Sequence, residues 1–132
     1  MLASNFPLQF IVVAILGTWM ANNIKQVTVI YFVKYNLQLE PYFGLILLGV
    51  ILQIMLGAVL ANAIKDKLEK KNIYILGTVL YVVADLIIYF VTGYENFWLL
   101  AFVGFFSFIG FGMAGVATWS MIADTIEYGE WK

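Results

Sequence analysis

Two ionisable side chains, Lys25 and Asp85, lie within long apolar stretches of the chain. A charged group at the depth of a membrane costs a few kcal/mol and usually faces protein or water, so each is a candidate functional residue. On a helix, three more polar side chains share an arc of about 100° with Lys25: Thr18, Asn22 and Gln26. We call these four residues the polar stripe. The polar stripe predicts a substrate cavity, and the alternative is that Lys25 alone extends to the outer membrane interface.

Asp85 has four hydroxyl-bearing residues on its side of a helix: Thr78, Tyr81, Tyr89 and Thr92. Their hydroxyl groups can satisfy a carboxyl group at this position. Three environments fit Asp85: a protonated carboxyl group bound by the tyrosines, a carboxylate near a thinned interface, or an ion pair with Lys25. Both residues lie roughly 10 to 14 Å from the outer ends of their spans, so their depths permit the pair. The role of this intramembrane acid stays open.

Trp119 is a candidate for contact with a sugar. It is a large aromatic residue with an N–H donor, and it stands between Thr118 and Ser120. This combination is typical of surfaces on which sugar rings stack. The alternative is a tryptophan of the interfacial belt. Trp119 is therefore assigned to the predicted substrate cavity together with the polar stripe.

The composition excludes several classes of protein. Of the 132 residues 64% are apolar and 11% are charged, which is too little polar surface for a soluble domain of this size. The net charge is −1, and the sequence has no Arg and no His, so we expect no nucleic-acid partner. There is no Ser/His/Asp set, no cluster of metal ligands and no phosphate-binding glycine loop. We therefore expect neither an enzyme nor a metal site.

The candidate residues are carried by four apolar stretches, each long enough to cross a membrane as a helix. The predicted spans are about 6–34, 41–64, 72–92 and 97–123. Their continuous apolar runs lack the alternation of barrel strands, so the predicted fold is all-α and integral to the membrane. Gly57-x-x-x-Ala61 predicts a close helix contact, and the glycines from Gly110 to Gly115 fit either packing or bending of the last span.

The loop between the second and third spans sets the predicted orientation. It carries most of the lysines of the chain: Lys65, Lys67, Lys70 and Lys71. Short lysine-rich loops stay on the cytoplasmic side. With four spans, both termini are then cytoplasmic as well, and residues 1–132 form a single four-span segment, N-in and C-in.

The last ten residues read ADTIEYGEWK. They resemble the A-D-x-x-[DE]-Y-G-E-[WY]-K signature at the cytoplasmic end of the tenth helix in the glycoside/pentoside/hexuronide:cation symporters. That family is a branch of the major facilitator superfamily and includes the melibiose permeases. Residues 24–35 are similar to its seventh helix, which ends in Y-[YF]-F-x-Y. The spacing of the two runs matches helices seven to ten, so the resemblance covers all 132 residues.

The resemblance implies part of the C-terminal six-helix bundle of a twelve-span transporter. The implied function is cation-coupled symport of a sugar or glycoside across the cytoplasmic (inner) membrane, and the fragment alone would be inactive. The implied partners are the lipid bilayer, the sugar and the remaining helices of the transporter. No cofactor is implied, and the site of the coupling cation, Na⁺ or H⁺, is expected outside this chain. Three carboxylates would form a cytoplasmic gate: Asp124, Glu127 and Glu130. The alternative for them is a solvated acidic surface.

Some residues depart from the family pattern, and two other functions compete with symport. Val33 replaces an aromatic residue, and Asn36 and Gln38 stand where the family commonly has Val and Gly, which leaves the substrate open. A complete four-helix drug/proton exchanger fits the length, but the first span lacks the embedded Glu that such exchange requires. The third possibility is a non-transporting membrane interaction protein.

Overall fold

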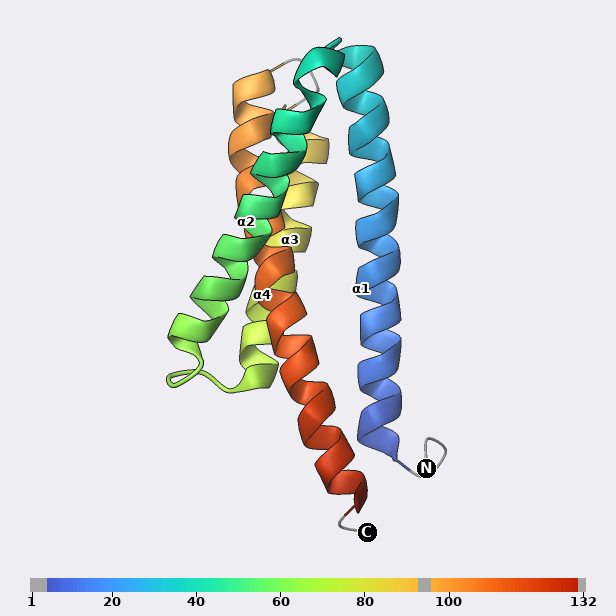
Figure 1. The fold of residues 1–132 in the computed structure, drawn as a ribbon, viewed down its shortest axis with the longest axis vertical. Helices are drawn as coiled ribbons and strands as arrows, with labels where there is room; N and C mark the ends of the chain where they lie inside the picture. The colour runs from blue at the N-terminus through green and yellow to red at the C-terminus, as the bar shows by residue number, and fades with distance from the viewer. Residues whose placement is uncertain (1–4, 93–95, 131–132) are drawn as a thin grey trace. The chain divides into compact units, whose positions relative to one another are not determined.

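The structure is a computed structural model that describes residues 5–92 and 96–130. All elements in these two ranges are helices. For residues 92 and 128–130 the structure describes the backbone alone. The elements are α1 (Phe6–Tyr31), η2 (Phe32–Asn36), η3 (Glu40–Tyr42), α2 (Phe43–Ile64), α3 (Lys70–Ile87), η4 (Ile88–Thr92) and α4 (Phe97–Glu130). Figure 1 labels the four α-helices. Four helices are long and apolar enough to cross a membrane. The predicted all-α membrane fold is confirmed.

Two helices extend beyond the predicted apolar spans. α3 begins at Lys70 rather than near Asn72, and α4 continues to Glu130 rather than ending near Ala123. Lysine and glutamate are good helix formers, so a polar residue ends an apolar stretch without ending the helix that contains it. The predicted limits therefore mark where the chain becomes polar, and the helix limits mark where the ladder of hydrogen bonds stops.

Wide turns close the end of the first span at η2. The N–H of Leu37 donates to the carbonyl oxygen of Phe32 at 3.1 Å, and the N–H of Leu39 donates to that of Val33 at 3.2 Å. Between these two donors, Gln38 has a φ of 52°, in the left-handed region that favours glycine. The backbone thus adopts a left-handed conformation at Gln38, the position at which the symporters that this sequence resembles commonly carry glycine.

Replacing Gln38 by glycine is expected to stabilise the chain by about 0.5 to 1 kcal/mol, because it removes the cost of a left-handed non-glycine residue, partly offset by a more flexible unfolded chain. The matched control is Asn36→Gly, since Asn36 belongs to η2 and is not a positive-φ position; it should lose stability. Denaturant unfolding in detergent micelles measures both changes. Equal shifts in the same direction would contradict the role assigned to the backbone at Gln38.

The chain divides into two compact units. The first unit comprises the residues up to Leu48 together with those from Ile122 onward, and the second unit comprises Gly49–Met121. The first unit thus holds α1, the turn that follows it and the last turns of α4. The second unit holds most of α2, all of α3 and the greater part of α4.

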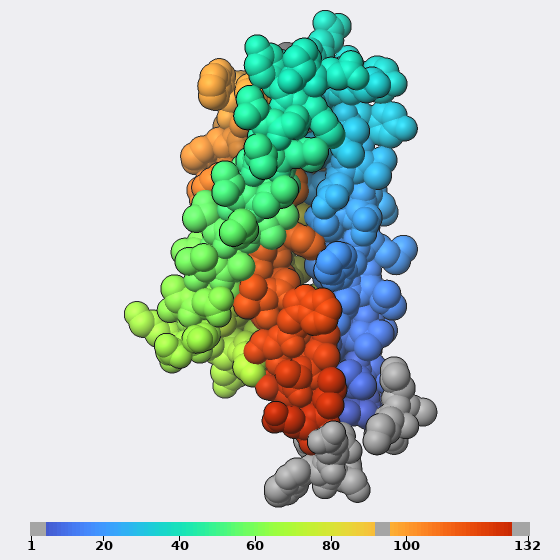
Figure 2. All heavy atoms as spheres, viewed as in Figure 1, coloured from blue at the N-terminus to red at the C-terminus, as the bar shows by residue number. Residues whose placement is uncertain are grey.

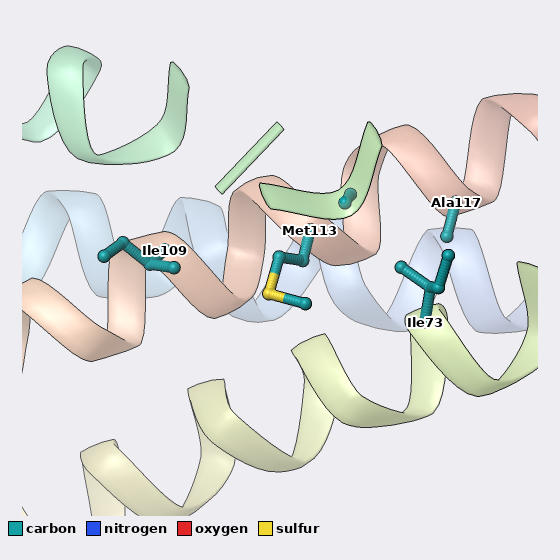
Figure 3. Packing of buried hydrophobic residues seen from close by; sticks show 5 residues of the cluster. Ile73, Ile109, Met113 and Ala117 are labelled. Carbon is teal, nitrogen blue, oxygen red and sulfur yellow. The ribbon is translucent and has the colours of Figure 1, made fainter. Parts of the chain in front are cut away.

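A small apolar core holds the second unit together. It contains Ile109, Met113 and Ala117 of α4, Ala61 of α2 and Ile73 of α3, each at most 6% exposed. The three α4 residues are spaced by four and therefore lie on one face of the helix. In Figure 3 the Ala117 and Ile73 side chains approach each other, and Met113 lies between the helices. The expected contact at Ala61 is thus part of this core.

Glycines bring the backbones of the second unit into contact. A Cβ added at Gly77 of α3 would lie 2.6 Å from the carbonyl oxygen of Gly110 in α4, and one added at Gly110 would lie 2.5 Å from that of Gly77. A Cβ added at Gly57 of α2 or at Gly112 of α4 would lie even closer to a backbone carbonyl oxygen of the opposite helix. We call these the two glycine crossings. Gly110 and Gly112 therefore serve packing, as small residues do where membrane helices approach closely.

Apolar side chains remain exposed along the whole of α1, which is blue in Figure 2. Examples spread over the helix are Phe6, Phe10, Val13, Met20, Ile24 and Val27, all at least 53% exposed. An apolar surface of this kind needs lipid or further helices to cover it. The exposed residues of α1 thus agree with a helix that faces a membrane or other helices.

Candidate functional site

Asn22 is the one buried residue of α1, with 3% of its surface exposed. Its side-chain oxygen Oδ1 is buried and accepts no hydrogen bond from any residue that the structure describes. A buried acceptor without a donor lowers the stability of the fold by about 1 to 3 kcal/mol, so a group of this kind is often kept for a function. The amide of Asn22 is therefore the strongest candidate in the polar stripe for binding a donor group of a ligand.

The other residues of the polar stripe have different surroundings. The Thr18 hydroxyl donates to the carbonyl oxygen of Ala14 at 2.8 Å, so its proton is used within the helix. Lys25 is half-buried and Gln26 is exposed. The polar stripe thus combines one buried amide with a half-buried cation.

Trp119 lies in the second unit, and its side chain is 68% exposed. One helical turn before it, a Cβ built on Gly115 would meet no atom within 4 Å. An aromatic ring beside open space can accept a flat apolar face such as that of a sugar. The assignment of Trp119 and the polar stripe to one substrate cavity stays a prediction.

Asp85 accepts a hydrogen bond across two helices of the second unit. The hydroxyl of Ser107 in α4 donates to Asp85 Oδ1 in α3 at 2.8 Å, and Ser107 Oγ also lies 3.5 Å from the carbonyl oxygen of Tyr81. Ser107 is fully buried, with 0% of its surface exposed. The pair therefore joins α3 and α4 inside an apolar unit, where such a bond typically contributes about 0.6 kcal/mol and at most about 1.7.

The partners predicted for Asp85 have mixed outcomes. Tyr89 is 67% exposed, the Thr78 hydroxyl is buried without a hydrogen-bond partner among the described residues, and the Thr92 side chain lies outside the described residues. Lys25 belongs to the first unit and Asp85 to the second, so their ion pair stays a prediction. Sequence reasoning missed Ser107, although a single hydroxyl residue within Phe105-Phe106-Ser107-Phe108 was a usable signal.

The predicted cytoplasmic gate lies on the last turns of α4. Asp124 and Glu127 are both exposed, and the side chain of Glu130 lies outside the described residues. Thr125 between them is 9% exposed, and its carbonyl oxygen accepts a hydrogen bond from Nδ2 of Asn5 at 3.2 Å. The sequence did not single out Asn5, because an asparagine before a helix reads as an ordinary N-cap.

Within residues 5–92 and 96–130, no group of three or more His, Cys, Asp and Glu side chains is placed to hold a metal ion. The polar groups described above are amides, hydroxyls, an ammonium group and separate carboxylates. Such groups bind and orient a polar solute by hydrogen bonds and charge. On α1, the buried amide of Asn22 and the half-buried ammonium group of Lys25 are groups of this kind.

Comparison with known proteins identifies the family. The family model described as "MFS/sugar transport protein" matches residues 1–132. The chain is 35% identical to the "Putative 2,3-dihydroxypropane-1-sulfonate exporter" of Escherichia coli (strain K12), with 99% of this chain and 28% of that protein covered. It is 31% identical to the "Uncharacterized symporter YjmB" of Bacillus subtilis (strain 168), with 98% and 28% covered.

A third relative is the "Isoprimeverose transporter" of Lactiplantibacillus pentosus, 24% identical, with 99% of this chain and 27% of that protein covered. No solved structure matches the chain. The chain spans less than a third of the length of these relatives. The relatives are transporters, so the prediction that the chain is not an enzyme is confirmed, as are the multi-pass membrane character and the resemblance to the sugar symporters. The chain therefore belongs to the MFS/sugar transport family of membrane proteins.

Proposed function

We propose that this chain is part of a secondary active transporter that moves a sugar or glycoside across the cytoplasmic (inner) membrane together with a cation. The observation that carries the proposal is the buried amide oxygen of Asn22, which has no donor among the described residues. A sugar presents several hydroxyl donors to such an acceptor. Membership of the sugar-transport family and the symporter among the relatives support the same function.

Each candidate residue has a distinct role in this proposal. Asn22 accepts a hydroxyl proton of the sugar, Lys25 donates to a sugar oxygen, and Trp119 stacks against the face of a ring. Thr18 and Gln26 line the polar path along α1. Binding through several weak polar contacts suits a transporter, because a substrate that is held too tightly cannot be released.

The remaining parts of the mechanism need chain segments outside these residues. Alternating access requires two bundles that rock about a site near the membrane midplane. The coupling cation, Na⁺ or H⁺, is expected to bind in those other segments, and no cofactor is proposed. Asp124, Glu127 and Glu130 would form ion pairs with the same segments at the cytoplasmic face. The partners in this proposal are thus the lipid bilayer, the sugar and the remaining helices.

Uptake in proteoliposomes tests the proposal. The 132-residue chain and the longer transporter that would contain it are reconstituted separately, and transport of a panel of neutral and acidic sugars is measured in both directions under Na⁺ or H⁺ gradients. We expect saturable, gradient-dependent transport by the longer protein and none by the chain alone. Transport of sugars by the chain alone would overturn its assignment as part of a longer transporter. Proton-driven export of a cationic drug by the chain would favour the four-helix drug/proton exchanger. No sugar transport by either would contradict the function.

A further inference from the structure

Asn5 makes two hydrogen bonds at the start of α1. Its Oδ1 accepts from the N–H of Leu8 at 3.4 Å, which caps the helix. Its Nδ2 donates to the carbonyl oxygen of Thr125 in α4 at 3.2 Å, across 120 residues of sequence. Both residues belong to the first unit. An amide suits this position because it has an acceptor and a donor on one short side chain.

The accepting carbonyl lies in the acidic segment of α4. Thr125 is buried, whereas Asp124 and Glu127 on either side of it are exposed. The Thr125 hydroxyl donates to the carbonyl oxygen of Ile122 at 2.8 Å. This bond lies within α4 and holds the Thr125 side chain against its own helix. Thr125 is thus held on its buried side while its acidic neighbours remain on the surface.

We propose that Asn5 is a positioning residue for the acidic segment, and that its bond to Thr125 fixes Asp124 and Glu127 relative to the start of α1. A helix cap requires a side-chain acceptor and nothing more, so the donor half of the amide has this second task. The inference rests on the proposed function in one respect: Asp124 and Glu127 form the cytoplasmic gate. The bond orders the gate carboxylates before any partner from another segment binds them.

Two substitutions separate the bond from the cap. Asn5→Asp and Asn5→Ser both keep a good cap, because Asp and Ser are preferred at this position. Both lose the amide donor, and the first adds a negative charge whereas the second stays neutral. Asn5→Ala loses the cap as well. Protection of the Leu8 amide from hydrogen exchange reports the cap separately from the bond.

The measurement uses the 132-residue chain in lipid nanodiscs. The sequence has no native cysteine, so nitroxide labels can be attached at Phe10→Cys and Ile126→Cys, whose native side chains are 71% and 53% exposed. We expect one narrow distance distribution in the parent chain. In the Asp and Ser variants, the distribution should at least double in width while Leu8 stays protected.

An unchanged width in the Ser variant would overturn the proposal, and a broadening confined to the Asp variant would overturn it too, because charge repulsion would then be the cause. Broadening that occurs only in the Ala variant would show that the cap alone orders the segment. In the longer transporter, Asn5→Ser should lower the maximal transport rate about threefold or more with an unchanged KM. If the distances respond but no sugar is transported by the parent protein, the positioning role stands and the proposed transport function fails.

Discussion

Replacing Gly110 by leucine is expected to destroy the packing of the second unit, with a loss of more than about 3 kcal/mol. A Cβ at Gly110 would lie 2.5 Å from the carbonyl oxygen of Gly77 and 2.7 Å from the amide nitrogen of Tyr81. These are backbone atoms, so no change of rotamer can relieve the overlap, and α3 would have to move away from α4. Loss of the close approach would also separate Ser107 from Asp85, because their hydrogen bond joins the same two helices.

The matched control for this prediction is Gly115→Leu on the same helix, where a Cβ meets no atom within 4 Å. It adds the same side chain and the same gain in helix propensity, about 1 kcal/mol. Unfolding of the 132-residue chain by SDS in mixed micelles measures both variants. We expect a large fall in stability for Gly110→Leu and an equal or higher stability for Gly115→Leu. Similar losses for the two variants would contradict the glycine crossing between α3 and α4.

Asn22→Leu is expected to lower transport and raise stability at the same time. The substitution removes an acceptor that we assign to the sugar, so the affinity of the longer transporter for its substrate should fall roughly tenfold to a hundredfold, equivalent to about 1.4 to 2.8 kcal/mol. In the substrate-free chain the same oxygen is buried without a donor among the described residues. Its removal should therefore stabilise that state by up to about 1 kcal/mol.

Asn23→Leu provides the control for this second prediction. Asn23 is exposed, and its Nδ2 donates to the carbonyl oxygen of Trp19 at 2.7 Å, within the same helix. The control should change the KM for transport less than twofold. Initial-rate uptake gives the KM, and SDS unfolding gives the stability. A destabilised Asn22→Leu chain would show that the amide supports the fold, and an unchanged KM would remove Asn22 from the proposed site.

The helices could be predicted from the sequence because apolar length decides whether a segment crosses a membrane. The end of α4 at Glu130 could not, because the polarity of Asp124 and Glu127 ends the apolar stretch and not the hydrogen bonding. The left-handed conformation of Gln38 was visible only as a departure from a family glycine. Local sequence does not report the backbone conformation that a non-glycine residue is forced to adopt.

The candidate site was predictable where one helix carries the signal and less so where two helices contribute. The polar stripe could be predicted because its residues recur with the helical period. That period does not show which of them is buried, and the structure gives Asn22 as the buried one. The Ser107 hydroxyl comes to Asp85 from another helix, and the Asn5 amide comes to Thr125 from the far end of the sequence. Such pairings depend on how the helices pack, which spacing along one helix cannot give.

The two glycine crossings also constrain how the gene for this chain can change. A glycine codon becomes, by any single-base missense change, the codon of a residue that has a Cβ atom. At Gly57, Gly77, Gly110 and Gly112 that atom would meet backbone of the opposite helix. Every missense change at these four codons is therefore sterically costly, and a second mutation in a nearby side chain cannot compensate, because the obstacle is the peptide chain itself. Gly104 and Gly115 face open space, so their codons are free of this constraint within the chain.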